Sequence, residues 1–215
     1  MIRIGHFSDL HSNIARITGA ESVDVWVCTG DFFPNATRGD RAVEEPFQTE
    51  WFTSVKDELF VRLGGRPLIW VEGNHDYVSL AKLLREHGYA GQVWDLADGP
   101  VDFGGHRFAG FGEIPWIEGE WNGETHDLRP LVDRAFDQDP TILVTHSPAS
   151  GILDEVGGGH GDGIRPLTIA LTYRPHRIVL SLCGHIHEQG GKRIEMMGVL
   201  FVNSACCTQL IELRD

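Results

Sequence analysis

Five short groups of polar residues each follow an apolar run of strand length. The groups are Asp9-Leu10-His11, Gly30-Asp31, Gly73-Asn74-His75-Asp76, Thr145-His146 and Gly184-His185-Ile186-His187. Open α/β sheets bind ligands just beyond the carboxyl ends of their strands, so the sheet can bring all five to one edge. Their carboxylates, amide and imidazoles are a mixed oxygen and nitrogen ligand set, which suits manganese, iron, zinc, cobalt or nickel better than calcium. The set is too large for one tetrahedral ion and fits two.

A two-metal site needs a carboxylate that bridges ions roughly 3.5–4 Å apart. Asp31 is the natural bridge, because it stands alone after its strand and follows a glycine that lets the backbone come close. Two such ions act together on one substrate and its attacking water. His75 is left over from the ligand set.

The elements that must position these residues alternate between strands and helices in the first half of the chain. This alternation predicts βαβ units and a partly parallel sheet. Short strands with turn signals over 92–112 predict hairpins, and the acidic segment 113–127 is expected to be a surface excursion that could cover a site. Strands are expected at 2–8, 23–29, 67–72, 141–145, 178–183, 199–202 and 208–213, with helices at 13–20, 44–63, 79–87 and about 165–173.

The order D-x-H, G-D, G-N-H-D, T-H and G-H-x-H resembles the calcineurin-like metallophosphoesterase superfamily, and these motifs span residues 9 to 187. The resemblance implies an α/β fold in which two mixed β-sheets pack as a sandwich flanked by helices, here as a single domain over residues 1–215. It also implies two divalent ions, with manganese expected first. By that similarity the first ion is held by Asp9, His11, Asp31 and His187, and the second by Asp31, Asn74, His146 and His185. The implied activity is in-line hydrolysis of a phosphoester by a metal-bridging hydroxide, because two ions lower the pKa of a shared water and neutralise charge on the phosphoryl oxygens. His75 and Asp31 are the implied catalytic residues, and His75 would donate a proton to the departing oxygen.

Further details of the motifs bear on the substrate. Gly30-Asp31 continues as Phe32-Phe33-Pro34-Asn35, without the aspartate and arginine of the protein-phosphatase branch, which argues against phosphoprotein substrates. The segments 145–148, 151–159 and 183–188 are similar to small phosphoesterases grouped with cyclic-nucleotide phosphodiesterases. We therefore expect small phosphodiesters, cyclic nucleotides among them, or phosphomonoesters as substrates.

Three other residues have open roles. Asp76 could orient His75 or could be a turn residue. His160 lies in a glycine-rich loop whose amides could cradle a phosphate, and Arg165 could clamp one, although such loops are usually turns and such arginines are usually solvated. Two alternatives to the phosphoesterase hypothesis also stay open. One is a metal-dependent exonuclease, and the other is a non-catalytic scaffold with this fold that binds proteins.

Composition limits the partners and the compartment. With 31 acidic and 18 basic residues the net charge is −13, which disfavours duplex nucleic acid as a partner. No apolar run approaches a membrane span, and residues 1–11 do not resemble a signal peptide, so we expect a cytoplasmic protein that does not bind membranes. The four cysteines form no C-x-x-C pair and are expected to be buried free thiols. The sequence leaves the oligomeric state open.

Overall fold

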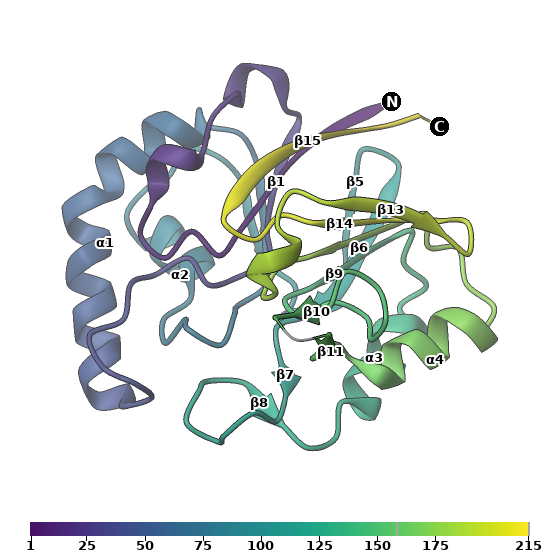
Figure 1. Ribbon diagram of the computed structural model, residues 1–215. Coiled ribbons are helices and arrows are strands. Elements are labelled where there is room, and N and C mark those ends of the chain that lie inside the picture. The colour runs from purple at the N-terminus through teal and green to yellow at the C-terminus, as the bar shows by residue number, and fades with distance from the viewer. Residues whose placement is uncertain (158, 215) are drawn as a thin grey trace.

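The computed structural model describes residues 1–157 and 159–214, which form two mixed β-sheets packed face to face with helices on the outer faces (Figure 1). The first sheet has the order β15-β1-β2-β3-β4. Strand β15 runs antiparallel to β1, and the other neighbours are parallel. Its strands are β1 (Ile2–Ser8), β2 (Val25–Cys28), β3 (Leu68–Trp70), β4 (Val93–Asp95) and β15 (Cys207–Leu213).

The second sheet has the order β13-β14-β12-β9-β6-β5, in which β14, β12, β9 and β6 are parallel and the two edge strands are antiparallel. Its strands are β5 (Val101–Phe103), β6 (His106–Phe111), β9 (Ile142–Thr145), β12 (Leu180–Cys183), β13 (Arg193–Met196) and β14 (Val199–Asn203). Two short pairs lie outside the sheets, β7 (Ile114–Pro115) with β8 (Glu124–Thr125) and β10 (Glu155–Val156) with β11 (His160–Gly161). The α/β sandwich expected from the motifs is confirmed.

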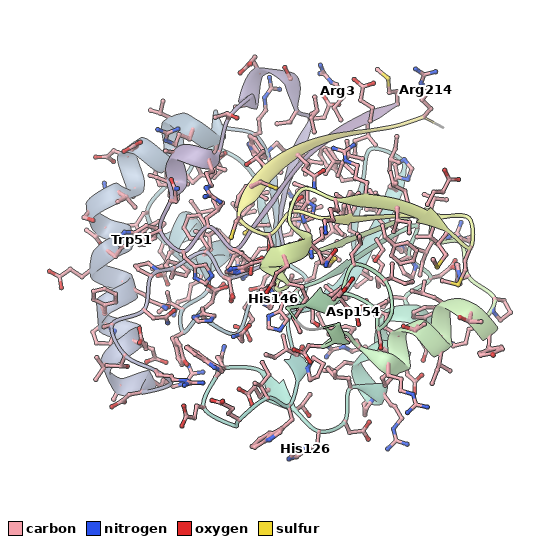
Figure 2. The ribbon with its side chains drawn as sticks, in the orientation of Figure 1. Arg3, Trp51, His126, His146, Asp154 and Arg214 are labelled. Atoms are coloured by element: carbon pink, nitrogen blue, oxygen red, sulfur yellow. The ribbon has the colours of Figure 1, made fainter. Side chains whose placement is uncertain are left out.

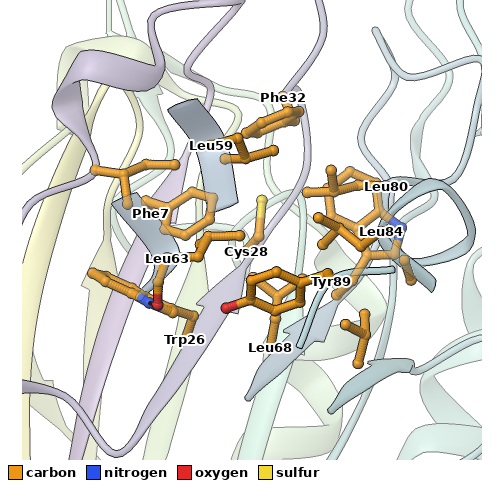
Figure 3. Packing of buried hydrophobic residues seen from close by; sticks show 14 of the residues in the cluster. Phe7, Trp26, Cys28, Phe32, Leu59, Leu63, Leu68, Leu80, Leu84 and Tyr89 are labelled. Carbon is orange, nitrogen blue, oxygen red and sulfur yellow. Dashed lines mark hydrogen bonds between the residues drawn. The ribbon is translucent and has the colours of Figure 1, made fainter. Parts of the chain in front are cut away.

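Side chains of the first sheet alternate between two buried faces, as the period of a strand requires. On β2, Val25 and Val27 pack in the core between the two sheets, whereas Trp26 and Cys28 pack on the outer face. Figure 3 shows this outer core, in which Trp26 and Cys28 lie with Leu59 and Leu63 of the first long helix. A third core lies between the second sheet and the later helices.

In the part of the chain that the structure describes, four α-helices cover the sheets. Figure 1 shows α1 and α2 on one side and α3 and α4 on the other. They are α1 (Arg41–Leu63), α2 (Leu80–Glu86), α3 (Arg129–Asp137) and α4 (Arg165–Tyr173). The first begins three residues before the predicted start, because the Asp40 side chain accepts a hydrogen bond from the amide of Ala42. It ends as predicted, with Gly64 in the left-handed conformation at φ 62°.

Several predicted elements need correction. The helix expected over 13–20 is replaced by two 3-10 turns, Ile14–Arg16 and Ala20–Ser22, separated by Gly19 at φ 84°. The edge strand β13 and the helix α3 were not predicted. All four cysteines are free, as expected, but Cys206 and Cys207 are only half-buried. Within residues 1–157 and 159–214, no helix combines the length and apolar character that a membrane span requires.

Candidate metal centre

Two groups of side chains with metal-ligand atoms lie at the carboxyl ends of the central strands. The first contains Asp9, His11 and His187, and in each group the ligand atoms lie within 4.8 Å of one another. The second contains Asp31, His146 and His185. Figure 2 places His146 near the centre of the view, between the side of the molecule that carries α1 and the side that carries α4. The two sheets therefore deliver ligand-type side chains to one place from strand ends far apart in sequence.

Asp31 belongs to the second group and also approaches the first. Its Oδ2 is 3.4 Å from Nε2 of His146 in the second group and 3.9 Å from Nε2 of His11 in the first. The first group is held together by His187 Nε2, which lies 3.2 Å from Asp9 Oδ1 and 3.4 Å from His11 Nε2. This is the arrangement that a shared carboxylate requires, and it agrees with the role predicted for Asp31.

The two residues in the middle of the Gly73–Asp76 turn point to different neighbours. Asn74 is buried, and its Oδ1 lies 3.0 Å from Nε2 of His146, so it joins the second group. The His75 ring lies beside both groups, with Nε2 4.0 Å from Asp31 Oδ2 and its ring 4.9 Å from the His11 ring between centroids. The structure thus brings all seven predicted metal ligands together, and His75 lies beside the two groups without being a member of either.

Asp76 is a backbone anchor. Its fully buried carboxylate accepts hydrogen bonds from the amides of Asp31, Phe32, Phe33 and Gly73, at 2.7 to 3.2 Å. Of the two roles left open by the sequence, the turn role agrees with these contacts. The carboxylate fixes the loop after β2 against the loop after β3, and orienting His75 falls to another residue.

Asn35 is that residue, and the sequence argument missed it. Its Oδ1 lies 2.7 Å from Nδ1 of His75, and its Nδ2 donates to the His75 carbonyl oxygen at 3.0 Å. Gln48 on α1 donates to the same carbonyl at 2.7 Å and accepts from the amide of Tyr77. A sequence signal existed for Gln48, because it occupies a position on the buried stripe of α1, four residues before Phe52.

Four residues of the site have a strained backbone, and a glycine beside them leaves room for it. Asp9, His11, Asp31 and His185 have φ between 42° and 65°, which is uncommon for residues with a side chain and is found most often at functional sites. Gly73 is required beside them, because a Cβ there would lie 2.2 Å from Asp31 Oδ1. At each of these four positions a predicted ligand follows the end of a strand.

A second missed residue, Asn203 at the end of β14, holds the loop that carries the last two histidines. It is fully buried, and its Nδ2 donates to the carbonyl oxygens of Gly184 at 3.0 Å and Ile186 at 3.2 Å. The amide of His185 donates to Asp9 Oδ2 at 2.9 Å. Nothing in the sequence marks Asn203 as more than the last residue of a strand.

The electrostatics favour cation binding. Burial by itself raises the pKa of Asp31, but the charge of His146 and its hydrogen bond outweigh burial and hold that pKa well below its usual range. Burial lowers the pKa of His146, and the Asp31 charge outweighs it and raises that pKa to about 10. Burial and the His146 charge lower the pKa of His185 to about 4. The site therefore holds ionised carboxylates whose charge is balanced by a proton on His146, and such a proton is displaced when a metal binds.

The donor set fits two divalent ions. The two neighbouring groups offer imidazole nitrogens and carboxylate oxygens, which are ligands for borderline first-row metals.

Two residues that the sequence offered as substrate contacts, Arg165 and His160, have no contact with the metal-ligand groups among the described interactions. Arg165 is exposed at the start of α4 and lines a cavity of about 310 Å³ with Ser150 and Thr168. The His160 backbone pairs with Val156, and its side chain lies outside the described part of the structure.

Comparisons with known proteins agree with this geometry. The family model for calcineurin-like phosphoesterases matches residues 2–189. Among solved structures, a dimetal phosphatase from Danio rerio is similar with a TM-score of 0.56 and 13% identity, covering 94% of this chain and 86% of that one. A sulfate thiohydrolase, SoxB, from Thermus thermophilus has a TM-score of 0.40 and 14% identity, covering 92% of this chain and 37% of that one. A search of curated proteins gave no match.

Proposed function

Because the chain belongs to the calcineurin-like phosphoesterase family, we propose that it is a two-metal hydrolase of small phosphodiesters, cyclic nucleotides among them, with phosphomonoesters as the second substrate class. The observation that carries this proposal is the position of Asp31 between two groups of ligand-type side chains. We propose manganese as the first ion to test. The mixed imidazole and carboxylate ligands also suit iron, zinc, nickel and cobalt.

The chain's own residues divide the work. Asp9, His11, Asp31 and His187 would hold one ion, and Asp31, Asn74, His146 and His185 the other. The two ions, when bound, would supply an attacking water of lowered pKa and neutralise charge on the phosphoryl oxygens. The ligand atoms of each group already lie within 4.8 Å of one another, so binding the ions would need no large rearrangement of these side chains.

His75 would assist the leaving group. Since Asn35 Nδ2 donates to the His75 carbonyl, its Oδ1 faces Nδ1 of the ring and accepts that proton. Nε2 is then the nitrogen directed toward Asp31 and the reacting phosphate. To deliver a proton at Nε2 the ring must be an imidazolium, so leaving-group protonation is favoured at the lower end of the working pH range.

The experiment combines metal dependence with a matched variant. The chain is freed of metal, loaded separately with manganese, nickel, cobalt or zinc, and incubated with bis-p-nitrophenyl phosphate and with p-nitrophenyl phosphate. We expect turnover with at least one metal. His75→Ala should lose about 10²–10⁴-fold with cyclic nucleotides, whose alkoxide leaving group needs a proton, and far less with the p-nitrophenyl esters, whose leaving group needs none. No turnover with any of the four metals would contradict the proposal. Comparing 2′,3′-cyclic and 3′,5′-cyclic nucleotides then ranks the natural substrate classes.

A further inference from the structure

The loop that joins β7 and β8 is built around one carboxylate. Glu124 accepts hydrogen bonds from the backbone amides of Ile117 and Glu118 at 3.1 Å, from Trp121 at 3.2 Å, and from Gly119. These contacts lower the pKa of Glu124, although its burial acts in the opposite direction. A carboxylate that gathers four amides gives this surface loop a defined shape, which a stretch of acidic residues would not otherwise have.

Asn122, which follows Trp121, fastens the loop to the turn that carries Asn74 and His75. The Asn122 amide donates to the carbonyl oxygen of Asn74 at 3.1 Å, and its Nδ2 donates to the carbonyl oxygen of Asp76 at 2.7 Å. Its Oδ1 accepts from Arg41 of α1 at 2.7 Å. The loop is therefore fixed on both sides of His75, at the residue before it and the residue after it.

These two sets of contacts place Trp121 on the imidazole of His75. The ring centroids are 4.1 Å apart with planes at 40°. The guanidinium of Arg38 lies over the same indole, 5.4 Å from its centroid. Arg38 in turn forms ion pairs with Glu118 and, at 3.0 Å, with Glu120 of the loop. The indole therefore contacts both the imidazole and a cation that is paired with carboxylates of the loop.

We propose that Trp121 is a positioning residue for His75. Asn35 fixes the ring at Nδ1, and Trp121 covers its face, so the imidazole keeps Nε2 directed toward the metal groups. This inference rests on the proposed function, because it concerns the histidine that would protonate the leaving group. A ring that can turn away from the phosphate delivers its proton less often, and the cost is greatest where the leaving group is a poor one.

The chain offers its own control. Trp116 belongs to the same segment, is 48% exposed and stacks on His126 with centroids 4.2 Å apart. We therefore compare Trp121→Ala, Trp121→Phe and Trp116→Ala in the metal-loaded protein. The substrates share one non-leaving group and differ in their leaving group, p-nitrophenol, phenol or methanol.

For Trp121→Ala we expect kcat to fall about tenfold to a hundredfold for the methyl ester and less than threefold for the p-nitrophenyl ester. Trp121→Phe should restore most of the loss, and Trp116→Ala should stay within twofold of the parent throughout. Adding Trp121→Ala to His75→Ala should cost no more than His75→Ala alone, because the two act through one group. Equal losses across the leaving groups, or the same loss in Trp116→Ala, would overturn the proposal.

Two readouts do not depend on turnover. Metal analysis should give the same two ions per chain in the parent, in His75→Ala and in the Trp121 and Trp116 variants. In NMR spectra of the metal-free protein, the ring protons of His75 should move by several tenths of a ppm when Trp121 becomes alanine and far less in Trp116→Ala. An unchanged His75 shift refutes the contact even if the parent proves inactive, whereas absence of turnover in the parent refutes only the proposed function.

Discussion

The backbone amide of Asp31 donates to Oδ2 of Asp76 at 2.7 Å, so one predicted metal ligand depends on a carboxylate that touches no metal group itself. Asp76 also accepts from the amide of Gly73 at 2.8 Å. The side chains of Asp31 and Asp76 are both buried. The close approach of the loops after β2 and β3, which carry Asp31 and Asn74, therefore rests on this anchor.

Replacing Asp76 with asparagine should destabilise the fold. The amide of asparagine presents donors to backbone amides that also donate, which leaves at least one buried group unsatisfied, at a cost on the order of 3 kcal/mol. Chemical denaturation of the metal-free protein measures this change. The control is Asp98→Asn, whose side chain is 75% exposed and should change stability by less than about 0.5 kcal/mol. Equal stability of the two variants would mean that the anchor contributes nothing.

Asn35→Ala should reduce turnover without removing metal. The variant loses the acceptor for Nδ1 of His75, so we expect a fall of about tenfold to a hundredfold in kcat with two ions retained per chain. Asn35→Asp keeps the acceptor and adds a charge that raises the pKa of the imidazolium. In that variant the activity that needs protonated His75 should persist to higher pH. A pH–rate profile that does not move would show that the contact has no part in catalysis.

His6 should make the fold sensitive to acid. It is buried between Thr29 and Ser204, and burial lowers its pKa to about 3 from an ordinary value of 6.5. Above pH 6.5 neither state binds the proton. Below it the unfolded chain binds the proton and the folded chain does not, so stability falls by about 1.4 kcal/mol per pH unit until pH 3. From pH 7 to 5 the loss from this group is about 2 kcal/mol.

The measurement is the unfolding free energy of the metal-free protein at several pH values. His6→Gln should have a shallower dependence between pH 6.5 and 5 than the parent, whatever its absolute stability. Parallel curves for the parent and His6→Gln would contradict the assignment of the acid sensitivity to this residue.

The sequence marked the residues that the structure gathers into the two groups better than it marked the residues that support them. Asp9, Asn74 and His187 follow apolar runs, and a ligand side chain after a strand is visible in one sequence because its type and position both carry the signal. Asn35 and Asn203 act through contacts between loops distant in the chain, and asparagine in a loop is too common to mark such a contact.

The fold shows the same division. Strands buried on both faces, such as β2 and β3, were placed within two or three residues, because continuous apolar runs are specific to them. The helix expected over 13–20 was wrong because the backbone becomes extended at Ile17, with ψ 109°, after a single 3-10 turn, and Gly19 then lies in the left-handed conformation. The helix α3 was missed although its buried residues, Val132, Ala135 and Phe136, have the i, i+3, i+4 spacing of one helix face, so this signal was present in the sequence.

The last prediction concerns the different roles proposed for two neighbours, Asn74 as a metal ligand and His75 as a proton donor. Oδ1 of Asn74 lies 3.0 Å from Nε2 of His146, whereas the His75 imidazole is held by Asn35 and Trp121. Asn74→Ala should therefore lose affinity for one ion, about tenfold or more, and approach one ion per chain at limiting metal. His75→Ala should keep two ions and lose turnover. Metal content after dialysis, read by mass spectrometry, separates the two. If His75→Ala instead empties the site, His75 belongs to the ligand set, and the role assigned to its neighbour Trp121 becomes support of a metal rather than of a proton donor.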